Sequence, residues 1–91
     1  MYAVRIMVDG KIVDLKIFET LPDAQLRFRC GWAQAYDGDF DSIAIFRISD
    51  ALNVRDAAIA VRSGDLARVE LVDIQESREI SISKLDIRID L

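Results

Sequence analysis

Three aspartates alternate along the segment YDGDFDS, at Asp37, Asp39 and Asp41. Carboxylates with this spacing are the first ligands of a calcium-binding loop, which uses positions one, three and five. Such a loop also needs glycine at its sharp turn and a bidentate acid at position twelve. Counted from Asp37, those two positions hold Ser42 and Ile48. The segment lacks the residues that complete a calcium cage, so we expect no metal site here.

The same three aspartates suggest an acidic surface for a basic partner. They follow the carboxyl end of a predicted helix, where the helix dipole is negative and additional carboxylates are mildly unfavourable. A basic partner would relieve that repulsion, so we take Asp37, Asp39 and Asp41 as candidate partner-binding residues. The alternative is a solvated turn, in which Gly38 ends the helix in the left-handed region.

The rest of the composition excludes most catalytic chemistry. The chain has no histidine, the commonest general base and metal ligand, and its only cysteine is Cys30. Cys-His and Ser-His nucleophile pairs are therefore impossible, and one thiolate cannot hold a zinc or iron–sulfur site. The four glycines are isolated, so no glycine-rich loop can cradle a phosphate. We expect a non-catalytic protein without a cofactor.

A β-hairpin is the clearest element that could position such a surface. Apolar strands at residues 2–8 and 11–18 flank Asp9 and Gly10, a pair suited to the positive φ angles of a type I′ turn. A two-residue loop sets the register of the strands and places Arg5 opposite Asp14. We therefore expect a cross-strand ion pair between these two side chains.

A helix is predicted to follow Thr20, a favourable N-cap residue with Pro22 in the first turn behind it. One apolar stripe of this helix is expected to pack on the sheet. A second stripe consists of Leu26, Cys30 and Ala33. This second stripe requires cover, either from the next helix or from another chain, so we take it as a candidate partner-binding surface.

The remaining elements are a strand at 42–49, a helix at 54–63 capped by Asn53, and strands at 66–74 and 79–91. The order is ββαβαββ. We expect one α+β domain covering residues 1–91, built as a two-layer sandwich with a mostly antiparallel sheet and both helices on one face. The alternating segment at 85–91 could form a sheet edge that pairs with its copy or with a peptide.

Charge and hydropathy limit the class of partner. The formal net charge of −4 disfavours direct binding of nucleic acid, which requires a basic face. No run of about 18 uncharged apolar residues is present, so we expect no membrane span. A single cysteine cannot form an intramolecular disulfide, which fits a reducing compartment. We therefore expect a soluble cytoplasmic protein.

These observations favour a small protein–protein interaction or regulatory module, which we expect to form a homodimer and to bind a protein partner that the sequence does not identify. An acidic decoy, occupying the basic groove of a nucleic-acid-handling protein, is the alternative. Binding of a small ligand between sheet and helices is a third interpretation, supported by Tyr2, Trp32 and Tyr36 alone.

Overall fold

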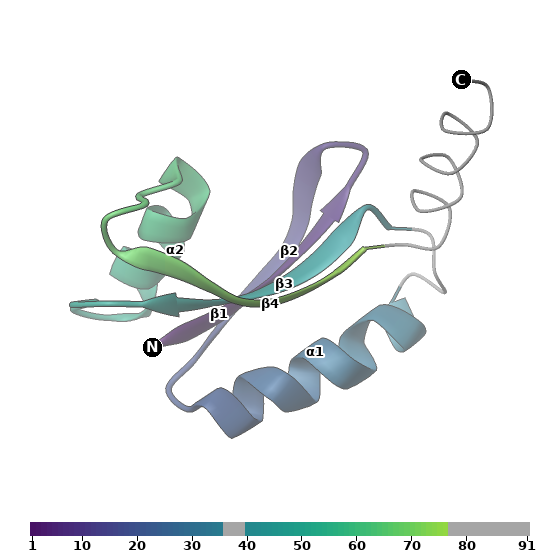
Figure 1. Cartoon of the computed structure of the whole chain (residues 1–91), viewed down its shortest axis with the longest axis horizontal. Helices are drawn as coiled ribbons and strands as arrows, with labels where there is room; N and C mark the ends of the chain where they lie inside the picture. The colour runs from purple at the N-terminus through teal and green to yellow at the C-terminus, as the bar shows by residue number, and fades with distance from the viewer. Residues whose placement is uncertain (36–39, 77–91) are drawn as a thin grey trace, which may run out of the picture.

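The computed structural model describes the backbone of residues 1–35 and 40–76 and the side chains of residues 1–29 and 40–76. Within these ranges, the chain forms a four-stranded antiparallel sheet and two helices in the order ββαβαβ (Figure 1). The predicted α+β class and the first six elements of the predicted order are confirmed. The predicted final strand, including residues 85–91, lies outside the described residues.

The first two strands, β1 (Tyr2–Val8) and β2 (Lys11–Phe18), form the predicted hairpin. Asp9 and Gly10 between them have φ angles of 52° and 74°, the positive values that a type I′ turn requires.

The predicted hairpin register holds only near the turn. A β-bulge shifts the pairing between Ile6 and Met7 by one residue, so Asp14 lies opposite Ile6 and Leu15 lies opposite Arg5. The predicted pair between Arg5 and Asp14 is therefore wrong. The shift directs Asp14 toward the first helix, where it forms an ion pair with Arg27.

Both helices begin at the predicted caps. The Asp23 amide at the start of α1 (Leu21–Ala35) donates a 3.4 Å hydrogen bond to the Thr20 hydroxyl. The Asp56 amide in α2 (Val54–Ser63) donates a 2.8 Å bond to the Asn53 side chain. These bonds satisfy amides that the helix itself leaves without partners.

The strand order in the sheet is β2-β1-β3-β4. Strand β3 (Ser42–Ile48) is an inner strand and pairs with both β1 and β4 (Val69–Glu76). The two outer strands of the described sheet are therefore β2 and β4.

The two helices pack on opposite faces of the sheet, so the prediction that both lie on one face is corrected (Figure 1). Side chains of β1 alternate between the faces: Val4 lies in the core beneath α1, and Ala3 lies in the core beneath α2. Strand β3 alternates in the same way, with Ile45 beneath α1 and Ile48 beneath α2. Strands that are apolar on both faces require cover on both.

Candidate binding surfaces

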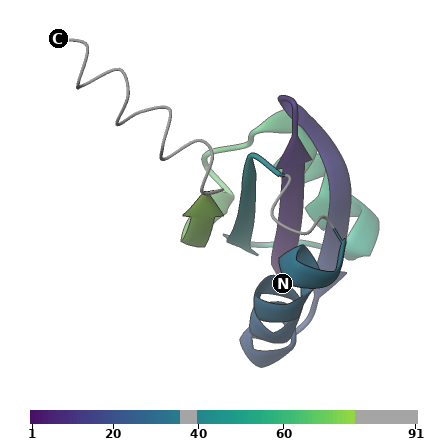
Figure 2. The same cartoon turned by 90° about the vertical axis from the view of Figure 1, so that its right-hand side faces the viewer.

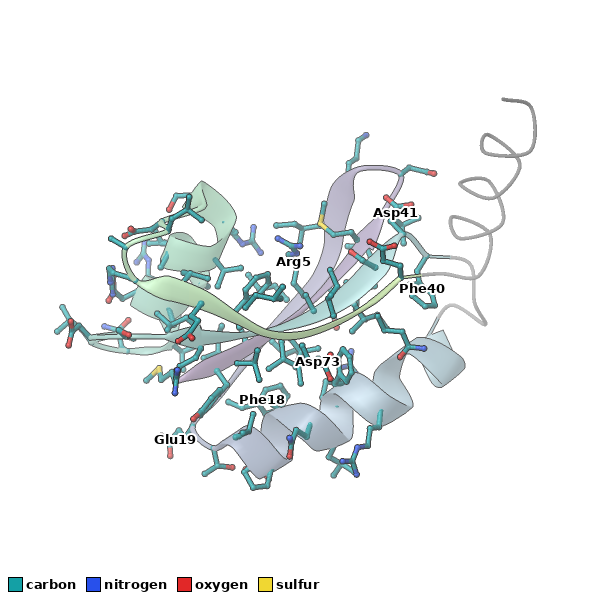
Figure 3. All side chains as sticks on the ribbon, in the orientation of Figure 1. Arg5, Phe18, Glu19, Phe40, Asp41 and Asp73 are labelled. Atoms are coloured by element: carbon teal, nitrogen blue, oxygen red, sulfur yellow. The ribbon has the colours of Figure 1, made fainter. Side chains whose placement is uncertain are left out.

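One aspartate of the predicted acidic loop, Asp41, forms hydrogen bonds within the fold. The Asp41 carboxylate accepts a 2.8 Å hydrogen bond from the Gly10 amide, and the Asp41 amide donates a 2.8 Å bond to the Met7 carbonyl. Its neighbour Phe40 is buried in the core beneath α1, so the segment is anchored beside the hairpin turn (Figure 3). Asp41 therefore stabilises the turn. Asp37 and Asp39 lie outside the described residues, and their predicted role in partner binding stays a prediction.

The described residues contain neither a metal-binding cluster nor a membrane-spanning helix. Within the residues that the structure describes, no three His, Cys, Asp or Glu side chains gather closely enough to hold a metal ion. No helix in the described ranges combines the length and apolar character needed to cross a bilayer. The calcium prediction concerns Asp37 and Asp39 and stays untested.

Of the second apolar stripe of α1, only the side chain of Leu26 is among the described residues. Leu26 is 64% exposed, and α2 cannot cover it because α2 packs on the other face of the sheet. The side chains of Cys30 and Ala33 lie outside the described residues, although their backbone belongs to α1. The stripe was expected to be covered either by the second helix or by another chain. At Leu26, the second helix does not provide that cover.

The largest apolar exposure on a strand occurs on β4, which the sequence did not single out. Leu71, Val72 and Ile74 are 51%, 41% and 42% exposed. Figure 2 shows β4 at the outer edge of the sheet, on the side away from both helices. We call this outer side the β4 edge; it has no neighbouring strand among the described residues.

A β-bulge divides the β4 edge into two chemically different faces. The register shifts around Val72, so Leu71 and Ile74 lie on the same face, opposite Phe46 and Ala44 of β3. The other face carries Glu70 and Asp73. The bulge breaks the alternation of facing that an undisturbed strand would have.

One polar cluster ties β4 to the start of α2. The guanidinium of Arg68 donates hydrogen bonds to Asp56, at 2.5 Å, and to the carbonyls of Ser49 and Asp50, at 3.3 and 3.2 Å. The hydrogen bond from Arg68, followed by that from the Leu52 amide, holds the pKa of the Asp56 carboxyl below its ordinary value. Every group in the cluster has a partner, so we assign it a structural role.

One arginine on the face that carries α2 has no such partner. Arg5 stacks on Phe46, with its guanidinium carbon 4.8 Å from the ring centroid. Its Nε atom is buried and makes no hydrogen bond within the described residues. Burial lowers the pKa of Arg5 because a charged group is less well solvated there.

Comparison with known protein-family models, curated proteins and solved structures finds no match for this chain.

Proposed function

We propose that the chain is a small, non-catalytic protein–protein interaction module of the cytoplasm, and that it forms a homodimer along the β4 edge. The observation that supports this proposal is the exposure of Leu71, Val72 and Ile74 on an outer strand. A strand edge presents backbone N–H and C=O groups that can pair with a strand of another chain. Neighbouring apolar side chains then add the burial that makes such pairing stable.

A second copy fits this edge by symmetry. Two β4 strands that pair antiparallel about a twofold axis would join two four-stranded sheets into one continuous sheet. Leu71 and Ile74 share one face of β4, so the same apolar face of both copies would become continuous. The exposed Leu26 of α1 is the competing interface, and it lies on a different element.

The charges of β4 predict how such a dimer responds to salt. The strand contains Glu70, Asp73 and Glu76 and no lysine or arginine. Glu70 forms a 2.5 Å ion pair with Arg47, but two copies would still bring like charges together. Because salt screens exposed charges, the dimer should tighten as ionic strength rises.

An acidic decoy remains the second candidate function, and the same three carboxylates on β4 favour it. Binding of these residues to a basic groove would weaken steeply as ionic strength rises. The two candidates therefore predict opposite effects of salt on complex formation. Asp41 contributes less to a decoy than the sequence suggested, since its carboxylate is bonded to Gly10.

Sedimentation velocity over a range of concentrations tests the homodimer. We expect the wild-type chain to dimerise, and Leu71→Asp to yield a folded monomer, because an unpaired carboxylate is costly to desolvate in an interface. Leu52→Asp is the matched control, since Leu52 is also highly exposed but lies in the loop before α2. That variant should dimerise like the wild type.

Leu26→Glu separates the two possible interfaces. A monomer produced by Leu26→Glu, with a dimer retained in Leu71→Asp, would move the interface to α1. Wild-type chains that stay monomeric at hundreds of micromolar would refute the homodimer.

A further inference from the structure

The sheet face that carries α2 is only partly covered by that helix. Its core cluster lies at one end of the face, around Ala3 and Ile48 of the sheet and Ala57 of α2. At the other end Arg5 lies in a row across the sheet, between Leu15 of β2 and Ala44 of β3. Figure 3 shows Arg5 on the side of the sheet away from α1. The row meets the cluster beneath α2 at Leu15, whereas Ile74, at its far end on β4, belongs to neither core cluster of the described residues.

The residues in the row of Arg5 and in the row toward α2 are apolar, whereas Glu76 lies on the same face in the row on the other side, opposite Ser42. Ile74 continues the same row on β4, beyond Ala44, and Leu71 lies beside Phe46 in the next row. Both Leu71 and Ile74 are about half exposed. We call the surface formed by Arg5, Phe46, Leu71 and Ile74 the Arg5 face.

Arg5 is the only lysine or arginine on this face of the four described strands. The other three, Lys11, Lys16 and Arg47, pair with residues of β1 that pack in the core beneath α1. Its guanidinium forms none of the ion pairs found among the described residues, and its Nε atom there has no acceptor. The stacking on Phe46 orients the cation, which a carboxylate could then approach. Among the described residues, no carboxylate pairs with this guanidinium.

We propose that the Arg5 face binds an acidic amphipathic segment of another protein. The apolar side chains of that segment would cover Leu71 and Ile74, and one of its carboxylates would pair with Arg5. Charge complementarity selects this occupant over a second copy, because two Arg5 faces packed together would bring two unpaired cations close to each other. A small free anion would leave Leu71 and Ile74 exposed.

A pair of labelled synthetic peptides tests the proposal. Both are short and amphipathic with the same leucine spacing, and they differ only in a central Glu or Gln. Fluorescence anisotropy should show the wild-type chain binding the Glu peptide roughly tenfold more tightly, because hydrogen bonds to charged groups are the stronger kind. Arg5→Met, which keeps most of the stem but removes the charge, should abolish that preference. Arg55→Met is the control, because Arg55 is an exposed arginine of α2, and the preference should remain.

The comparison of the two peptides on the wild-type chain requires no variant, so it stands even if Arg5→Met fails to fold. Equal affinity for both peptides, or binding of neither, would overturn the proposal. A preference that survives in folded Arg5→Met would place the anion elsewhere and would also overturn it. Loss of wild-type self-association in Arg5→Met would identify a second copy as the occupant, contrary to the proposal. A monomeric wild type that discriminates between the peptides would refute the homodimer and support this inference.

Discussion

The two outer strands of the sheet differ in their protection. Strand β2 packs against both helices, and its exposed lysines, Lys11 and Lys16, are charges of the kind that discourage pairing with other chains. Strand β4 has no comparable packing against either helix, and its exposed residues include Leu71 and Ile74. Both strands contain a bulge, so a bulge alone does not explain the difference. Within the described residues, β2 is therefore packed against both helices, and β4 is the outer strand with more exposed apolar side chains.

The largest expected difference is in stability. Leu15 of β2 packs against the core cluster beneath α2, whereas Leu71 of β4 is half exposed. Leu15→Ala should lower the free energy of unfolding by about 2 kcal/mol, because it leaves a cavity. Leu71→Ala should cost less than about 1 kcal/mol. Urea denaturation at low protein concentration measures both. Equal losses would show that β4 is as well packed as β2.

The ion pair between Asp14 and Arg27 gives the next effect. It fastens β2 to α1 and is partly buried, with the two side chains 24% and 30% exposed. A double-mutant cycle with alanine at both positions should give a coupling energy of about 1 kcal/mol. The same cycle for Asp14 and Arg5 should be additive, since the bulge separates them. Coupling in the second cycle instead of the first would restore the register predicted from sequence.

Sequence reasoning succeeded where the signals were local. The positive φ angles at Asp9 and Gly10 and the N-cap at Asn53 all follow from residues within one turn of each other. The bulge in β2 accompanies the ion pair of Asp14 with Arg27 of α1, a tertiary contact that the turn residues do not specify. Such tertiary contacts override a register that turn geometry sets alone.

The candidate site was harder to predict than the fold. The aspartates of YDGDFDS stood out by spacing, yet Asp41 stabilises the hairpin turn. Leu71 and Ile74 did not stand out, because the bulge at Val72 removes the alternation that would have marked an amphipathic strand. The apolar character of β1 and β3 on both faces was the signal that could have separated the two helices.

The smallest expected effect concerns the polar cluster of Arg68 and Asp56, which joins the start of β4 to α2. Because the pKa of Asp56 is lowered in the folded state, the pair with Arg68 stabilises the protein at neutral pH. This contribution should begin to be lost as pH falls below about 4, the ordinary pKa range of aspartate. It should be lost fully once the pH is below the lowered pKa of Asp56 in the folded state. Asp56→Asn should therefore lower the melting temperature at neutral pH and matter little in strong acid.

Asp50→Asn is the control for this measurement. Asp50 lies in the loop before α2, and its side chain forms no ion pair within the described residues. Its replacement should leave the pH dependence of the melting temperature unchanged. A difference between Asp56→Asn and the wild type that persists at every pH would show that packing, and not charge, is responsible.

Amide hydrogen exchange of the two outer strands, measured at low and high protein concentration, tests the openness of the β4 edge most directly. Pairing along this edge should slow the exchange of amides in β4 as concentration rises, because their N–H groups acquire acceptors from the second copy. Exchange in β2 should stay constant. Protection that rises in β2 instead, or exchange in β4 that does not change up to hundreds of micromolar, would contradict the proposal that β4 is the assembly edge.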